Sequence, residues 1–150
     1  MTDTAAPIEL APKRWSRASR TLRGVRVGGR WVHLALALAV IGGVFVQVYL
    51  IGAYIFGAGQ GALDAHKSAG WTVHGLELLV FVAALIAWLP WVDLVLSFLL
   101  ALIGTVQVAL ANEHRWVGGL HPVLALVVAA LAATLVLRGI RQHDARVVRS

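Results

Sequence analysis

Two histidines, His74 and His121, stand in otherwise apolar stretches of this chain. A neutral imidazole is the commonest protein ligand for transition metals, because one of its ring nitrogens keeps a lone pair. Two imidazoles on facing elements can therefore hold one metal ion from opposite sides. Whether these two can do so depends on the elements that carry them.

Four apolar runs dominate the sequence, at residues 31–56, 69–89, 94–111 and 120–137. Hydrophobic residues make up 59% of the chain and charged residues 13%, which excludes a soluble globular domain. A helix needs about 20 apolar residues to cross a bilayer, and the runs lack the alternation of barrel strands. The sequence predicts an all-α fold, a four-helix transmembrane bundle in up-down-up-down order.

Basic residues flank this bundle, since every Lys and Arg except Lys67 and Arg115 lies before residue 31 or after residue 137. Cytoplasmic flanks hold such an excess, so both termini are predicted to be cytoplasmic. We expect a basic leader at 1–30, partly disordered or lying on the membrane surface, the bundle at 31–138 and a basic tail at 139–150. The net charge of +6 is ascribed to contact with the lipid bilayer and not to nucleic acid.

The calculated depths of the histidines differ. His74 lies about 24 Å of helix from Pro90, and His121 lies about 26 Å from Arg138, so these two are level. His66 lies about 36 Å from Pro90, at or beyond the outer edge of the hydrocarbon. Depth alone therefore pairs His74 with His121.

One face of the second span is polar and is predicted to look into the bundle. It carries His66, Gly70, His74 and Glu77. A carboxylate that faces lipid is costly, so Glu77 must be neutralised or hydrogen-bonded inside the bundle. Protonation, orientation of a ligand histidine, bonds from Gln47 or Gln107 and a proton relay are the alternatives.

Small residues line other spans. They are Ser97, Ala101, Gly104 and Ala111 on the third span and Ala125, Val128 and Ala132 on the fourth. Such strips make space for a porphyrin, but they also let membrane helices pack closely, and both explanations stay open. Gly42 and Gly43 could in the same way join two copies of the chain in a homodimer.

Histidines from facing helices of a bundle are typical axial ligands of heme iron. The chain has no cysteine, so a heme here is held non-covalently, as heme b is. The alternative is that each imidazole forms an ordinary hydrogen bond between helices. The residues alone favour neither reading.

The stretches LDAHKSAGWTVH at 63–74 and LHPVLAL at 120–126 resemble a family of small four-span bacterial membrane proteins of uncharacterised function. More distantly, residues 62–130 are similar to one four-helix half of the heme A synthases, in which histidines open the second and fourth helices. The resemblance implies a bacterial plasma membrane and assigns the ligands to His66 and His121, with His74 as an additional position. Lys67 could pair with a heme propionate at the outer surface, the alternative being an ordinary solvated lysine of the loop.

The chain departs from the synthase pattern in several respects. It has four spans instead of eight, Asp64 stands two residues before His66 where the synthases carry Glu three before, Lys67 replaces Arg, and the paired loop cysteines are missing. A complete heme-modifying enzyme is therefore not expected, and whether the chain is an enzyme stays open.

The sequence thus predicts a heme b-binding membrane protein for electron transfer or heme handling, acting with a membrane redox partner. One alternative is a cofactor-free assembly subunit of a membrane complex. Another is a proton or metal-ion conduit that uses Glu77, His74, His66 and His114.

Overall fold

The computed structural model describes residues 17–111 and 115–147, which form five helices. Their bounds are α1 (Arg17–Ile55), α2 (Gln60–Ile86), α3 (Trp91–Leu110), the short α4 (Arg115–Gly118) and α5 (Leu120–Val147). No strand occurs in these two ranges. By length and composition, 4 of the helices can cross a membrane, so the predicted all-α fold with four spans is confirmed.

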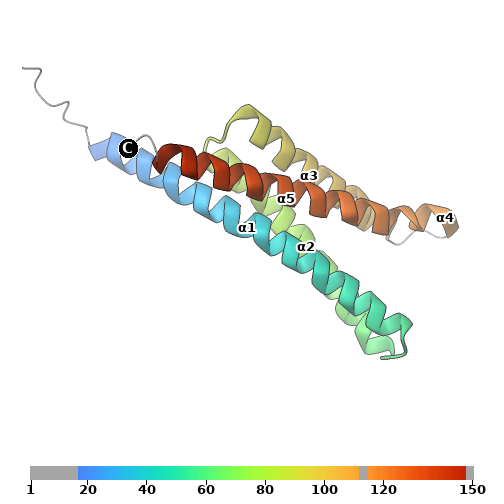
Figure 1. Ribbon diagram of the computed structural model, residues 1–150. Helices are drawn as coiled ribbons and strands as arrows, with labels where there is room; N and C mark the ends of the chain where they lie inside the picture. Colours follow the sequence, from blue (N-terminus) through green and yellow to red (C-terminus); the bar gives the residue numbers. More distant parts are fainter. Residues whose placement is uncertain (1–16, 112–114, 148–150) are drawn as a thin grey trace, which may run out of the picture.

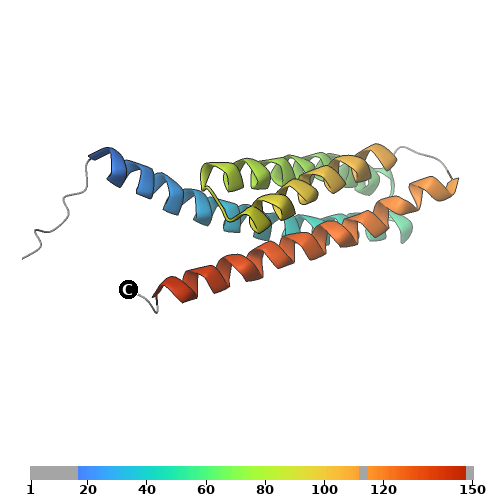
Figure 2. The same ribbon diagram turned by 90° about the horizontal axis from the view of Figure 1, so that it is seen from above.

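The four long helices form a ring in which α1 packs on α2, α2 on α3, α3 on α5 and α5 on α1. The beginning of α1 and the end of α5 lie at one end of the bundle (Figures 1 and 2). We call this the basic end, because it carries Arg30 and Arg138, and the opposite one the far end. Figure 1 shows the α1–α2 pair and the α3–α5 pair moving apart toward the far end.

The helices extend beyond the apolar runs. α1 begins at Arg17, so residues 17–30 of the expected leader are helical and continue into the first span, whereas residues 1–16 and 148–150 lie outside the described ranges. The helix passes through Gly29, where an added Cβ would lie 3.1 Å from the Cβ of Ala87, so this glycine lets α1 approach α2. α2 begins at Gln60 and therefore includes His66.

Left-handed residues end the first two long helices. After α1, Gly57 has a φ of 95°. After α2, Trp88 has a φ of 46°, and the N–H of Leu89 bonds the carbonyl of Ala84 at 3.1 Å, as in the usual left-handed helix end. Pro90 then caps α3, which keeps the reversal between α2 and α3 short.

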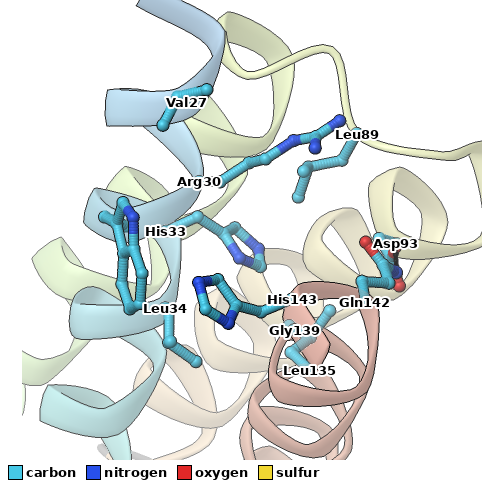
Figure 3. A pocket seen from close by; sticks show the side chains of 11 residues that line it. Val27, Arg30, His33, Leu34, Leu89, Asp93, Leu135, Gly139, Gln142 and His143 are labelled. Carbon is cyan, nitrogen blue, oxygen red and sulfur yellow. Dashed lines mark hydrogen bonds between the residues drawn. The ribbon is translucent and has the colours of Figure 1, made fainter. Parts of the chain in front are cut away.

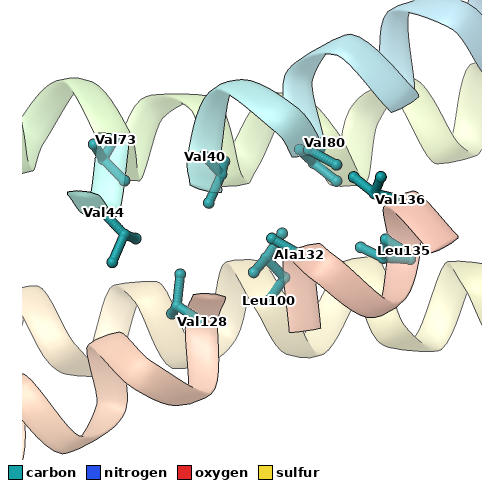
Figure 4. Packing of buried hydrophobic residues seen from close by; sticks show 10 residues of the cluster. Val40, Val44, Val73, Val80, Leu100, Val128, Ala132, Leu135 and Val136 are labelled. Atoms are coloured by element: carbon teal, nitrogen blue, oxygen red, sulfur yellow. The ribbon is translucent and has the colours of Figure 1, made fainter. Parts of the chain in front are cut away.

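The core consists of small and branched aliphatic side chains from all four long helices (Figure 4). Its buried members are Ala37, Val40, Val44, Val73, Val80, Leu100, Val128, Ala132, Leu135 and Val136. Larger apolar side chains such as Phe45, Tyr49 and Leu126 lie on the outside. Only 17–28% of the residues in the most apolar stretches are buried inside the bundle, which suits helices whose solvent is lipid.

Candidate cofactor site

A cavity of about 510 Å³ lies at the far end, where the two helix pairs move apart. All four long helices line it, and four residues singled out in the sequence border it: His66, Lys67, Gly70 and His121. Most other lining residues are apolar, including Trp71. Cofactor sites commonly measure about 300–1,000 Å³ and combine apolar walls with a few placed polar groups, so this cavity is of a suitable size and character.

The imidazoles of His66 and His121 come to this cavity from different helix pairs, α2 and α5. Their ring centroids are 6.3 Å apart, and their planes lie at 83° to each other. With metal–nitrogen bonds of about 2 Å, two imidazoles on opposite sides of one ion have centroids about 6 Å apart. The observed separation therefore fits two ligands of a shared metal ion.

Each of these rings is held by the main-chain carbonyl of a glutamine on the neighbouring helix. His66 Nδ1 lies 3.1 Å from the carbonyl oxygen of Gln47 on α1, and His121 Nδ1 lies 3.0 Å from that of Gln107 on α3. A carbonyl oxygen only accepts, so Nδ1 donates its proton and a neutral ring keeps its lone pair on Nε2. Metal-ligating histidines are commonly oriented in this way.

The side chains of the same two glutamines also border the cavity. Gln47 Oε1 and Gln107 Oε1 are both buried and have no hydrogen-bond partner. Gly70 makes space for one of them, since a Cβ there would lie 2.6 Å from Gln47 Nε2. A buried acceptor without a partner is costly, so a hydrogen-bond donor inside the cavity would stabilise these oxygens.

His74 lies elsewhere. It does not line the cavity, and its Nδ1 is 3.1 Å from Glu77 Oε2. Glu77 is completely buried and lies against Gly104 of α3, where a Cβ would come within 1.7 Å of Glu77 Oε2. Of the partners considered for Glu77, the structure therefore provides His74, while Glu77 Oε1 stays without a partner.

Equal depth suggested that His74 pairs with His121, whereas in the structure it is the ring of His66 that lies close to that of His121. The depth calculation treats the helices as parallel and places Pro90 and Arg138 at one height. The helix pairs instead diverge toward the far end. A residue farther out on α2 therefore meets His121 of α5.

The small-residue strips serve two purposes at two levels. Near the far end, Ala111 and Ala125 line the cavity. Toward the basic end, small residues pack between helices: Ser97, Ala101, Gly104, Val128 and Ala132 are buried there. Space for a ligand and close packing are thus both present, at different distances along the same helices.

Lys67 borders the cavity with an exposed side chain, so its ammonium group is available to an anionic group at the mouth.

The number of candidate metal ligands at the cavity is two. Two nitrogen ligands are enough for an iron that a porphyrin already holds by its own four nitrogens. Within residues 17–111 and 115–147, no group of three or more His, Cys, Asp or Glu side chains gathers around a common point. His114 lies outside these ranges.

A second polar cluster, which sequence reasoning missed, lies at the basic end around Asp93. Asp93 is 3% exposed, and its two carboxylate oxygens accept bonds from Arg138 Nε and, at 2.6 Å, from Gln142 Nε2. Ser97 Oγ donates to the Asp93 carbonyl at 2.7 Å and lies 3.0 Å from His33 Nε2. The sequence does contain a signal for this cluster. Asp93 lies at the start of the third span, at the depth where the last span reaches its basic flank at Arg138.

Comparison of the chain with protein-family models, with curated proteins and with solved structures gives no match. The resemblance to four-span bacterial proteins and to the heme A synthases therefore stays an expectation from the sequence.

Proposed function

We propose that this chain is an integral membrane protein that binds heme b non-covalently in the far-end cavity, with Nε2 of His66 and Nε2 of His121 as axial ligands. The observation that carries the proposal is the close pair of imidazoles, with centroids 6.3 Å apart on separate helix pairs. Each ring donates from Nδ1 to a main-chain carbonyl, which leaves Nε2 as the ligating atom.

The chemistry follows from the ligand set. A heme in this place supplies one-electron oxidation and reduction at iron. If both imidazoles held the iron, no coordination position would be left for a substrate, which favours electron transfer or the holding of heme over catalysis at the metal. The redox partner is then a second membrane protein or a membrane-soluble carrier that approaches the far end. Lys67 borders the cavity and would be placed to pair with a propionate of a bound heme.

The basic flanks orient the proposed site. Arg30 on α1 and Arg138 on α5 mark the basic end, and basic flanks stay on the cytoplasmic side of a bacterial plasma membrane. The helices then run up-down-up-down with both termini in the cytoplasm. The cavity lies toward the outer surface.

The test is the optical spectrum of the purified chain in detergent, recorded after expression with added heme precursor, before and after addition of dithionite. We expect a Soret band with sharp low-spin bands on reduction. His121→Ala should lose most of the bound heme, because it removes one of two ligands. His74→Gln should keep it, because His74 does not line the cavity and glutamine still reaches Glu77.

Absence of a Soret band from well-folded protein would contradict heme binding and leave the cofactor-free assembly subunit as the reading to pursue. Equal heme content in His121→Ala and in the unsubstituted chain would remove the cavity from the proposal. A loss of heme in His74→Gln as large as that in His121→Ala would also contradict the assignment of the ligands.

A further inference from the structure

A small cavity of about 90 Å³ lies at the basic end, the end of the bundle opposite to the histidine pair. The beginning of α1, the turn before α3 and the end of α5 border it (Figure 3). Arg30, His33 and His143 reach into it from α1 and α5, with Asp93 and Gln142 at its side.

The carboxylate in this cavity is already fully engaged. Arg138 Nε donates to Asp93 Oδ1, and Gln142 Nε2 donates to Asp93 Oδ2 at 2.6 Å. The charge of Asp93 is therefore balanced by Arg138, and neither of its oxygens is left to balance a second cation.

Arg30 is a second cation at this cavity, and the Asp93 carboxylate does not balance its charge. Its Nε is buried and has no hydrogen-bond partner, and no carboxylate within the described residues forms an ion pair with it. A buried guanidinium N–H without an acceptor is costly, and an oxyanion supplies the acceptors that the planar guanidinium group fits best. The cavity thus has one surplus positive charge and an unused donor.

Two imidazoles border the same space, and only that of His143 is left to donate a proton to an anion. Ser97 Oγ gives its proton to the Asp93 carbonyl, so His33 Nε2 is the donor in its 3.0 Å contact with Ser97 Oγ. His33 Nδ1 then carries the lone pair of the neutral ring, so His33 has no proton left to donate to an anion. The ring of His143 also lines the cavity, and its centroid lies 5.0 Å from that of Trp31 with the two planes at 61°.

We propose that this cavity binds a phosphate group, with Arg30 as its principal ligand and His143 as a further donor. Basic pockets between membrane helices on the cytoplasmic side are typical binding places for anionic lipid headgroups, and free phosphate has the same chemistry. Trp31, half exposed beside the cavity, is of the residue type that sits at the level of the headgroups.

The test uses the full chain in detergent and native mass spectrometry with phosphatidylglycerol or phosphatidylcholine added at equal concentration. We expect phosphatidylglycerol to be retained in preference, and Arg30→Gln to bind it about tenfold more weakly, because one charge-assisted contact is lost. Arg23→Gln removes the same charge from an exposed position on α1 that does not border the cavity, and it should bind as the unsubstituted chain does.

His143→Gln provides a second variant at an exposed side chain, which leaves the packed core untouched, and should weaken binding about threefold. Displacement of the lipid by millimolar inorganic phosphate assigns the site to the phosphate group alone, whereas retention of the lipid assigns it to a headgroup with attached chains. Retention of phosphatidylglycerol that Arg30→Gln leaves unchanged overturns the proposal. Equal effects of Arg30→Gln and Arg23→Gln do so as well.

Discussion

Single atoms decide how Glu77 can be buried in this bundle. Its Oε2 takes a bond from the ring of His74 and lies where a side chain on Gly104 would begin. Only the missing Cβ of Gly104 lets the carboxylate lie between α2 and α3. The Glu77 carboxylate therefore contacts His74 on its own helix and requires a glycine at position 104 of the facing helix α3.

We expect Gly104→Ala to destabilise the bundle by about 1–3 kcal/mol, as overpacking of a filled core does. The added Cβ would lie 1.7 Å from Glu77 Oε2, so the carboxylate must move. Thermal unfolding in detergent measures the effect. In a Glu77→Ala background, Gly104→Ala should cost much less, because the carboxylate that the added Cβ meets is gone. Equal penalties in both backgrounds would show that the two residues do not interact.

The contacts of individual side chains were the hardest part of the site to predict from the sequence. It supplied the six candidate residues of the site, and His66, Lys67, Gly70 and His121 do line one cavity. It could not supply the partners of the rings, because Gln47 and Gln107 contribute main-chain carbonyls that any residue type offers. Which carbonyl meets which ring depends on the packing of α1 on α2 and of α3 on α5.

At the scale of helices, close contact between α1 and α2 depends on which face a glycine occupies. Gly43 faces α2, where an added Cβ would lie 2.5 Å from Val73 Cγ2, whereas the adjacent Gly42 has nothing within 4 Å. Val73 is stiff because it is branched at Cβ, so it cannot easily give way. Gly43 is therefore used within the chain, and only Gly42 is left to contact a second copy.

We expect Gly43→Ala to lower the free energy of unfolding by about 1–3 kcal/mol through overpacking. Gly42→Ala is the matched control and should raise it by about 0.5–1 kcal/mol, because alanine favours the helix at an open position. Denaturation in detergent compares the two variants. A larger loss for Gly42→Ala than for Gly43→Ala would contradict this packing, or would show that Gly42 forms a contact between copies.

Asp93 connects α3 to α5 at the basic end. Asp93→Asn should destabilise the chain by about 1–2 kcal/mol, a modest value because the Arg138 side chain is 35% exposed and partly screened by solvent. Asp64→Asn removes the same charge at an exposed position on α2 and should change stability little. Heat denaturation at one ionic strength compares them. Indistinguishable midpoints would mean that the Asp93–Arg138 pair contributes nothing.

The helices themselves could be predicted because their signal is repeated over many residues. The four apolar runs all lie within or across helices that can span a membrane. Their ends were less accessible, since α1 continues back to Arg17 through Gly24, Gly28 and Gly29, residues that weaken an isolated helix. Packing can compensate for this weakness, and at Gly29 it does so through the contact with Ala87.

At the scale of the whole molecule, the two proposed sites lie at opposite ends of one bundle. The cavity with His66 and His121 is at the far end, and the cavity with Arg30 is at the basic end. If basic flanks stay in the cytoplasm, the first faces outward and the second meets the inner leaflet. This arrangement suits a protein that exchanges electrons or heme at one surface and is anchored by lipid at the other.

The chain has no cysteine, so single cysteines can report on its orientation. We expect Ala58→Cys, in the exposed connection after α1, to react with a membrane-impermeant thiol reagent on intact cells. Asp144→Cys, near the end of α5, should react only after the membrane is permeabilised. Labelling of both positions in intact cells, or of Asp144→Cys alone, would reverse or abolish the proposed topology.

The most direct measurement is the spin state of the iron in the purified, oxidised protein, read by electron paramagnetic resonance. Two imidazole ligands predict a low-spin signal in the unsubstituted chain, conversion to high spin in His66→Gly, and return of the low-spin signal when imidazole is added to that variant. A low-spin signal that survives in His66→Gly without added imidazole would contradict the pairing of His66 with His121 on one heme.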